Sequence, residues 1–309
     1  MNRFKNILCI VTGQTGDAAA LNRAVELAKA NDSKLTVLSL YTPISATSRL
    51  FIKQERASEL NSALEEKARA DLNQLVAELE PSLVQPLVQA ADSPFETILL
   101  VLKHKYDLVI KCKEDIGEPT LSSADMRLLR KCPCPVWFIN DAKKQRFKRI
   151  LVAVDVDPSE NERWRLHTEL LKMGTTLAER EKAQLDILCA WQAVSEATLS
   201  GPRLNMNDSE IAAFQEEQKA THQGWLDELM EPFQTQSVDI HTHLIRGPAH
   251  KVILEFIEQN AIDLLLMGTV ARTGIPGLII GNTAESVLGK AKTGILTVKP
   301  PGFKSPVSL

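Results

Sequence analysis

The residues best suited to chemistry lie in the segment 268–286, GTVARTGIPGLIIGNTAES, which follows the apolar run IDLLLM. Gly268 stands where a strand should end, and it would let a ligand approach the backbone. Gly281, Asn282 and Thr283 open a helical pattern, and the free N–H groups and dipole of a helix N-terminus favour an anion. This arrangement is typical of a loop that holds a phosphate.

A carboxylate stands at the end of another expected strand. The apolar run ILVAV is followed by Asp155, and the run ILC of the next expected strand leads to Ala190. The carboxylate of Asp155 can accept hydrogen bonds from a ribose. A glycine at a strand–loop junction also serves ordinary turns, but together with Asp155 and the Gly-Asn-Thr helix start it favours nucleotide binding.

The elements that must position these residues occur twice in the chain. Three pairs of segments resemble each other in the same order: KNILCIVTGQTGD from Lys5 and KRILVAVDVDPSE from Lys148, SPFETILLVLKHKYDLVIK from Ser93 and GPAHKVILEFIEQNAIDLLLM from Gly247, and LLRKCPCPVWFIN from Leu128 and VLGKAKTGILTVK from Val287. We therefore predict a duplicated domain. The polar and basic segment NDAKKQRFK is the expected joint, which gives domains 1–143 and 144–309.

Each half alternates short apolar runs with helical patterns. Runs rich in Val, Ile and Leu predict strands buried on both faces at 7–12, 35–41, 83–90, 107–111 and 135–139, and at 149–155, 184–191, 237–245, 262–268 and 294–299. Residues 17–30, with Asp17 as the expected N-cap, and residues 54–80 predict amphipathic helices. This alternation predicts an α/β fold with a parallel sheet in each half, whose ligands lie beyond the carboxyl ends of the strands.

The whole chain resembles the universal stress protein family, and its tandem, E-type members in particular. The resemblance rests on the two halves, on Asp155, on the motif MGTVARTGIPGLIIGNTAESVL before a last strand, and on LLRKCPCPVW closing the first half. It implies two tandem doubly wound parallel five-stranded sheets of the Rossmann-like, adenine nucleotide α-hydrolase-like type. It also implies that the last strands, PVWFI and GILTV, pair within the chain, forming an intramolecular pseudo-dimer and covering a sheet edge.

ATP-binding members of this family carry Gly-x2-Gly-x9-Gly-Ser/Thr after the fourth strand. Here Gly268 and Gly281 match the first and third glycines, whereas Ala271 replaces the second and Asn282 replaces the Ser/Thr. Ala271 adds a methyl group and penalises a positive φ, while Asn282 tolerates such a conformation and offers an amide donor. Arg272 can add positive charge beside a phosphate, although an exposed loop arginine is commonly just solvated.

The resemblance also implies a role for each matching residue. Asp155 would meet the ribose, Ala190 and Met267 would frame the adenine, and Gly281, Asn282 and Thr283 would cradle the phosphates.

The first half departs from this pattern. Thr12 stands where the copy has Asp155, and no glycine pattern follows the fourth expected strand. The acidic side chains of Glu114, Asp115 and Glu118 would oppose a phosphate. We therefore predict that the first half is a degenerate domain without a nucleotide.

Other candidates have ordinary alternatives. His241 and His243 would share one face of a strand and are weak zinc candidates, because no third ligand is evident. Cys132 and Cys134 flank a proline, and a turn into the last strand is favoured over a redox role. The loops before the long helices of the two halves could shape a pocket between the halves that admits an apolar ligand, although helix packing on the sheet is the simpler interpretation.

Composition limits the function classes. The net charge is −3 and the pI is about 6.1, which argues against nucleic acid as a partner. No apolar stretch reaches the length of a spanning helix, and the short apolar core near the N-terminus predicts a first strand rather than a signal peptide. Five cysteines without a CxxC pair fit a reducing compartment, so we expect a cytoplasmic protein.

These observations predict a stress-response regulator whose second half binds ATP or a related adenine nucleotide, with Mg²⁺ accompanying ATP. A protein partner, not identifiable from the sequence, would read its conformation. No catalytic residue is predicted, because no His follows the loop and no Lys takes the place it has in a P-loop. Two alternatives stay open: a nucleotide-free interaction scaffold and a slow ATP hydrolase.

Overall fold

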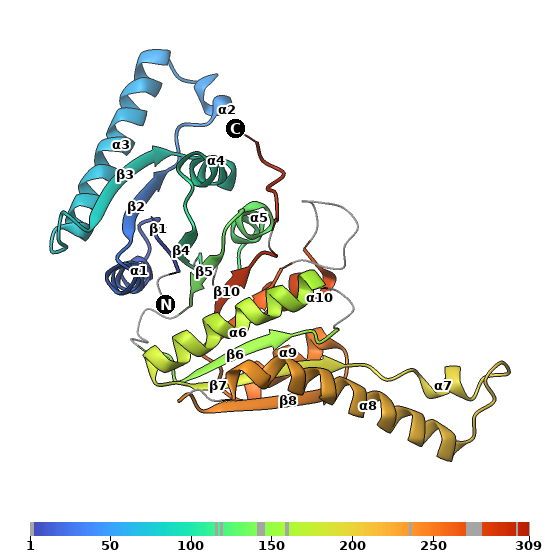
Figure 1. Cartoon of the computed structure of the whole chain (residues 1–309). Coiled ribbons are helices and arrows are strands. Elements are labelled where there is room, and N and C mark those ends of the chain that lie inside the picture. Colours follow the sequence, from blue (N-terminus) through green and yellow to red (C-terminus); the bar gives the residue numbers. More distant parts are fainter. Residues whose placement is uncertain are drawn as a thin grey trace.

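The computed structural model of the chain describes residues 3–114, 117, 120–140, 146–157, 161–234, 237–269, 280–300 and 302–308. Within them one ten-stranded sheet has the order β3-β2-β1-β4-β5-β10-β9-β6-β7-β8 (Figure 1). The five strands of each half are parallel to one another. The last strands, β5 (Val136–Ile139) and β10 (Gly294–Val298), pair antiparallel and confirm the expected pseudo-dimer.

The strands follow the predicted apolar runs. The first half contains β1 (Asn6–Val11), β2 (Lys34–Tyr41), β3 (Val84–Ala90) and β4 (Leu108–Cys112), and the second contains β6 (Arg149–Val154), β7 (Gln184–Trp191), β8 (Ile240–Arg246) and β9 (Leu264–Gly268). The edge strand β8 begins three residues later than predicted because its single neighbour, β7, begins at Gln184.

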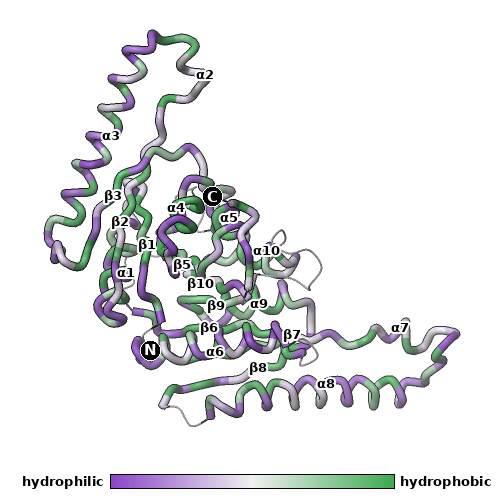
Figure 2. Tube along the Cα trace, turned by 45° about the horizontal axis from the view of Figure 1, so that its top comes forward, coloured by the Kyte–Doolittle hydropathy of each residue, from purple (hydrophilic) through white to green (hydrophobic). Residues whose placement is uncertain are grey.

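Helices cover both faces of the sheet. Helices α1 (Asp17–Asn31), α3 (Gln54–Val76), α6 (Asn161–Glu181) and α8 (Asp208–Met230) pack on one face, and α4 (Pro94–His104), α5 (Ser123–Lys131), α9 (Ala249–Gln259) and α10 (Asn282–Leu288) on the other. Two arms extend beyond the sheet: the short α2 (Ala46–Arg49) with the start of α3, and α7 (Glu196–Leu199) with the start of α8 (Figure 2). The 3-10 turn η1 (Glu231–Phe233) follows α8.

The expectation that Asp17 is the N-cap of α1 is wrong. Gly16 holds that position, and Asp17 is the first helical residue. Its Oδ2 accepts the N–H groups of Thr12 and Gly13 at 2.7 Å and of Gln14 at 3.0 Å. Asp17 therefore closes the loop after β1 instead of the helix end. Burial raises the pKa of this carboxyl group, and the three backbone hydrogen bonds oppose that shift.

An ion pair joins the helices that flank the junction between the halves. Arg23 of α1 bonds to Glu181 of α6, and both side chains are more than nine-tenths buried. The Arg23 guanidinium also lies 4.6 Å from the ring centroid of Phe147, whose N–H donates to Glu181 at 3.2 Å. The ion pair therefore holds Phe147, at the entrance to the second half, in contact with both helices.

Two buried lysines also cross the junction. Nζ of Lys113, after β4, donates to the carbonyl of Ala291 at 2.9 Å, and Nζ of Lys299, after β10, donates to that of Leu129 at 2.8 Å. Burial lowers the pKa of Lys113 to about 7 and that of Lys299 to about 8. Each half thus supplies one ammonium group to the other half's backbone.

Arg23→Ala should lower the free energy of unfolding by roughly 3–5 kcal/mol, because it leaves the Glu181 carboxylate buried without its guanidinium. Urea unfolding followed by circular dichroism measures the change. Arg69→Ala, which removes the exposed partner of Glu65, is the matched control and should cost less than about 1 kcal/mol. Equal costs for the two variants would contradict this assignment.

Candidate functional site

The carboxyl ends of three neighbouring strands form the predicted site in the second half. Strand β6 pairs with β7 on one side and with β9 on the other, so the strand order reverses at β6. Asp155 directly follows β6, Ala190 is the last residue but one of β7, and Met267 and Gly268 end β9. The fold therefore brings these four predicted residues to one edge of the sheet.

The start of α10 lies at the same edge. The N–H of Gly281 donates to the carbonyl of Thr269 at 3.1 Å, and Gly281 is the N-cap of α10. Asn282 and Thr283, the first two helical residues, are exposed to solvent. Ala271 and Arg272 lie outside the described residues, so the proposed effects of these two positions stay predictions.

Ala190 and Met267 lie on one face of the sheet. Met267 is buried in the hydrophobic cluster that also contains Ala284 of α10, and Ala190 packs against that cluster. Gly268 is turned the other way: a Cβ on it would lie 2.7 Å from Cδ2 of Leu166 on α6. Helix packing thus already requires a glycine here, and approach of a ligand to Gly268 stays a prediction.

Asp155 presents an accessible carboxylate. Its side chain is 67% exposed, and Oδ2 lies 3.1 Å from Nη1 of Arg163 in the first turns of α6. A ribose at this edge would therefore reach the carboxylate from solvent and share it with the arginine. The sequence pattern did not reveal Arg163, because nothing in its spacing ties it to Asp155.

A buried histidine holds the backbone of Asp155. The N–H of Asp155 donates to Nε2 of His167 at 3.3 Å, which requires the neutral imidazole with its proton on Nδ1. Burial lowers the pKa of His167 to about 4, and the nearby Asp155 carboxylate opposes this only in part. In the first half Asp17 makes the same contact with Thr12, so the internal repeat was the signal that could have identified His167.

The first half has a cavity of about 250 Å³ at its own carboxyl edge. Strand register places Thr12 at the position of Asp155, Leu40 at that of Ala190 and Lys111 at that of Met267. The lining residues come from α4 and α5 and from the carboxyl ends of β1, β2, β3 and β4: Ile10, Thr12, Leu40, Thr42, Ala91, Asp92, Ser93, Pro94, Thr97, Lys111, Glu114, Ala124 and Leu128.

Charges inside this first-half cavity are already paired. Nζ of Lys111 lies 2.6 Å from Oδ1 of Asp125 and 3.3 Å from Oε1 of Glu114. Glu114 lines this cavity, and Lys111 neutralises part of its charge. Asp115 and Glu118 lie outside the described residues.

The two histidines of β8 have separate partners. Nε2 of His241 lies 3.0 Å from Oδ1 of Asp239, whereas Nε2 of His243 lies 2.8 Å from Oδ1 of the buried Asp186. Arg149 also binds Asp186, at 2.9 Å. Among the described residues no group of three or more His, Cys, Asp or Glu side chains could hold a metal ion.

The cysteines form no disulfide. All five are free, and the sulfur atoms of Cys132 and Cys134 lie 3.5 Å apart in the turn before β5. Both thiols are buried, in agreement with a turn that enters the last strand.

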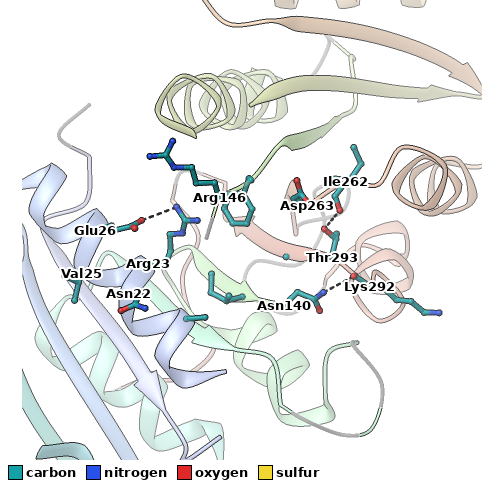
Figure 3. A pocket seen from close by; sticks show the side chains of 14 residues that line it. Asn22, Arg23, Val25, Glu26, Asn140, Arg146, Ile262, Asp263, Lys292 and Thr293 are labelled. Atoms are coloured by element: carbon teal, nitrogen blue, oxygen red, sulfur yellow. Dashed lines mark hydrogen bonds and ion pairs between the residues drawn. The ribbon is translucent and has the colours of Figure 1, made fainter. Parts of the chain in front are cut away.

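A separate cavity of about 500 Å³ lies between the halves (Figure 3). Arg23 and Glu26 of α1 face Asp263 and Thr293, which precede β9 and β10. It is therefore a charged cavity at the amino ends of these strands. No residue of the loops before the long helices lines this cavity, so it is not the predicted apolar pocket, which stays a prediction.

The fold and the site define a tandem pair of Rossmann-like α/β domains joined through their last strands. The sequence profile described as the Universal stress protein family matches residues 3–140 and again residues 146–299. The chain therefore belongs to the universal stress protein family. In the described residues no helix has both the length and the apolar character needed to cross a membrane.

Similar proteins cover the full length of the chain. It is 30% identical to the Universal stress protein E homolog of Haemophilus influenzae over 96% of this chain and 98% of that protein. Identity to Universal stress protein E of Escherichia coli K12 is 27%, over 100% of this chain and 98% of that protein. The crystal structure of a putative universal stress protein from Pseudomonas aeruginosa UCBPP-PA14 superposes with a TM-score of 0.71 at 25% identity, covering 97% of this chain and 94% of that one.

Stability should respond to pH through His167. Its folded pKa of about 4 lies below the ordinary 6.5, so the unfolded chain binds more protons between these values. The free energy of unfolding should fall by roughly 3 kcal/mol from this group as the pH drops from 6.5 to 4, with no further change below 4. Urea unfolding at several pH values, compared with His167→Gln, measures this. A wild-type pH slope retained in the variant would contradict it.

Proposed function

We propose that the second half of this chain binds ATP or a related adenine nucleotide, and that the chain acts as a stress-response regulatory protein. The observation that carries the proposal is the hydrogen bond from Gly281 N–H to the carbonyl of Thr269. This bond holds the glycine at the start of α10 beside the end of β9. The neighbouring strand, β6, is followed directly by the exposed Asp155.

Each part of a nucleotide would meet suitable groups. The carboxylate of Asp155 would accept hydrogen bonds from ribose hydroxyls. The partly buried Ala190 offers a small apolar surface to adenine, whereas Met267 is buried in the core and supports that edge from within. The exposed start of α10, with Asn282 and Thr283, offers N–H and side-chain donors to phosphate. The cavity at the corresponding edge of the first half supports the proposal, because this architecture leaves room there for a ligand.

Mg²⁺ would enter as a partner of the bound phosphates. Within the described residues no cluster of three acidic or histidine ligands would retain the ion by itself, so its binding should depend on ATP. A conformational difference between the free and the bound second half would then be read by a protein partner.

Asp155→Ala should weaken ATP binding by about 10- to 100-fold, because a hydrogen bond to a charged acceptor contributes about 1.5–3 kcal/mol. Isothermal titration calorimetry with ATP and Mg²⁺ measures the change. Thr12→Ala, at the corresponding position of the first half, is the matched control and should bind like the wild type.

The same titration separates the alternative functions. An absence of ATP binding by the wild type at millimolar concentration would overturn the proposal in favour of an interaction scaffold. Several turnovers per minute in a phosphate-release assay would instead favour an ATP hydrolase.

Ala271→Gly should tighten ATP binding by roughly 5- to 30-fold while leaving the melting temperature unchanged. ATP-binding relatives carry a glycine at this position, and a glycine would avoid the cost of a positive φ, about 1–2 kcal/mol, if the ATP-bound loop requires one. Calorimetry and thermal unfolding give the two quantities. Unchanged or weaker affinity would count against the assignment of this loop.

A further inference from the structure

We propose that the first half contains an oxyanion site that the chain fills with its own carboxylate, that of Asp125. The ligand class of this site is a small oxyanion, such as inorganic phosphate or the acidic group of a metabolite. The inference rests on first-half residues alone, so its outcome is independent of nucleotide binding by the second half.

Asp125 is held as a bound anion would be. Its side chain is fully buried, and Oδ1 accepts from Nζ of Lys111 at 2.6 Å. Oδ2 accepts the N–H groups of Glu114 and Ser122, each at 3.3 Å. An ammonium group, the end of a strand and the start of a helix therefore converge on one carboxylate, which is the donor set that a free oxyanion requires.

Asp125 also closes the capping box of α5, because its Oδ2 accepts the N–H of Ser122 while Oγ of Ser122 accepts the N–H of Asp125. The internal repeat nevertheless shows that the fold does not require this carboxylate. Ser122 and Gly281 are the N-caps of α5 and α10, so Asp125 corresponds to Ala284 three residues further on. Lys111 likewise corresponds to Met267 in the strand register. The second half folds the same way with neither charge, so the ion pair is an addition of the first half.

The pair also lies beside open space. Lys111 and Glu114 both line the cavity of about 250 Å³ described above, and Ala124 and Leu128 bring α5 to its wall. Removal of the Asp125 carboxylate would join its volume to this cavity. An oxyanion could then enter from the cavity and meet the ammonium group of Lys111.

The nearby charges set the limits of the site. The Glu114 carboxylate is 3.3 Å from Lys111 and competes for it, and Asp92 lies at the exposed rim. In the wild type these groups and Asp125 exclude external anions. The first half is thus occupied permanently, without a ligand from solution.

The test is chemical rescue by inorganic phosphate. Thermal unfolding is measured for the wild type, Asp125→Ala and Lys111→Met/Asp125→Ala, with phosphate titrated against sodium chloride at equal ionic strength. Asp125→Ala should melt lower than the wild type, and phosphate at ten times its Kd should raise its Tm by roughly 2 °C relative to the wild type in the same buffer. The double variant, which carries the second-half residues, should respond no more than the wild type.

Two further measurements test the role of Glu114 and cover the case in which Asp125→Ala does not fold. Glu114→Gln added to Asp125→Ala removes the competing carboxylate and should at least double the apparent affinity for phosphate. If Asp125→Ala does not fold in chloride, its refolding from urea should recover native protein in phosphate. A phosphate response equal to that of the wild type, or no recovery on refolding, would overturn the proposal.

Discussion

The antiparallel pairing of β5 with β10 is the interaction on which the rest of the molecule depends. Only three residue pairs form it, among them Leu296 with Trp137, yet it turns two five-stranded sheets into one. It removes an edge strand from each half. It also brings α1 against α6, so that Arg23 and Glu181 can pair out of water. Because the pairing is antiparallel, the carboxyl edges of the two halves face opposite ends of the sheet.

The strands could be predicted, because the inner strands are buried on both faces and have mainly apolar sequences. The edge strands β3 and β8 are only partly buried and carry polar residues. The predictions failed where contacts with a neighbouring segment, and not the local sequence pattern, determine the structure. The start of β8 is set by β7, and the carboxylate of Asp17 serves the loop before it, since three N–H groups there converge on one oxygen. Such contacts depend on the loop path, which residue order alone does not specify.

The location of the candidate site followed from the strand order, but its electrostatics did not. Asp155, Ala190, Met267 and Gly268 meet at one edge because parallel strands end together. The contact of Arg163 with Asp155 arises from the extra first turns of α6, which α1 lacks. The contact of His167 with Asp155 was signalled only by the internal repeat, through Asp17 and Thr12. One feature of the sequence does indicate the ion pair of Lys111. A lysine in a strand that is buried on both faces requires a buried anion as its partner.

The covalent joining of the two halves affects how their sequences can diverge. In a dimer of identical subunits every substitution appears at both sites, so a charge that fills one site fills the other as well. Here the gene can place Lys111 and Asp125 in one half while Met267 and Ala284 persist in its copy. A single chain can therefore carry an ion pair in one half while the matching position of the other half stays uncharged. Because the halves are covalently joined, they also stay together at any dilution.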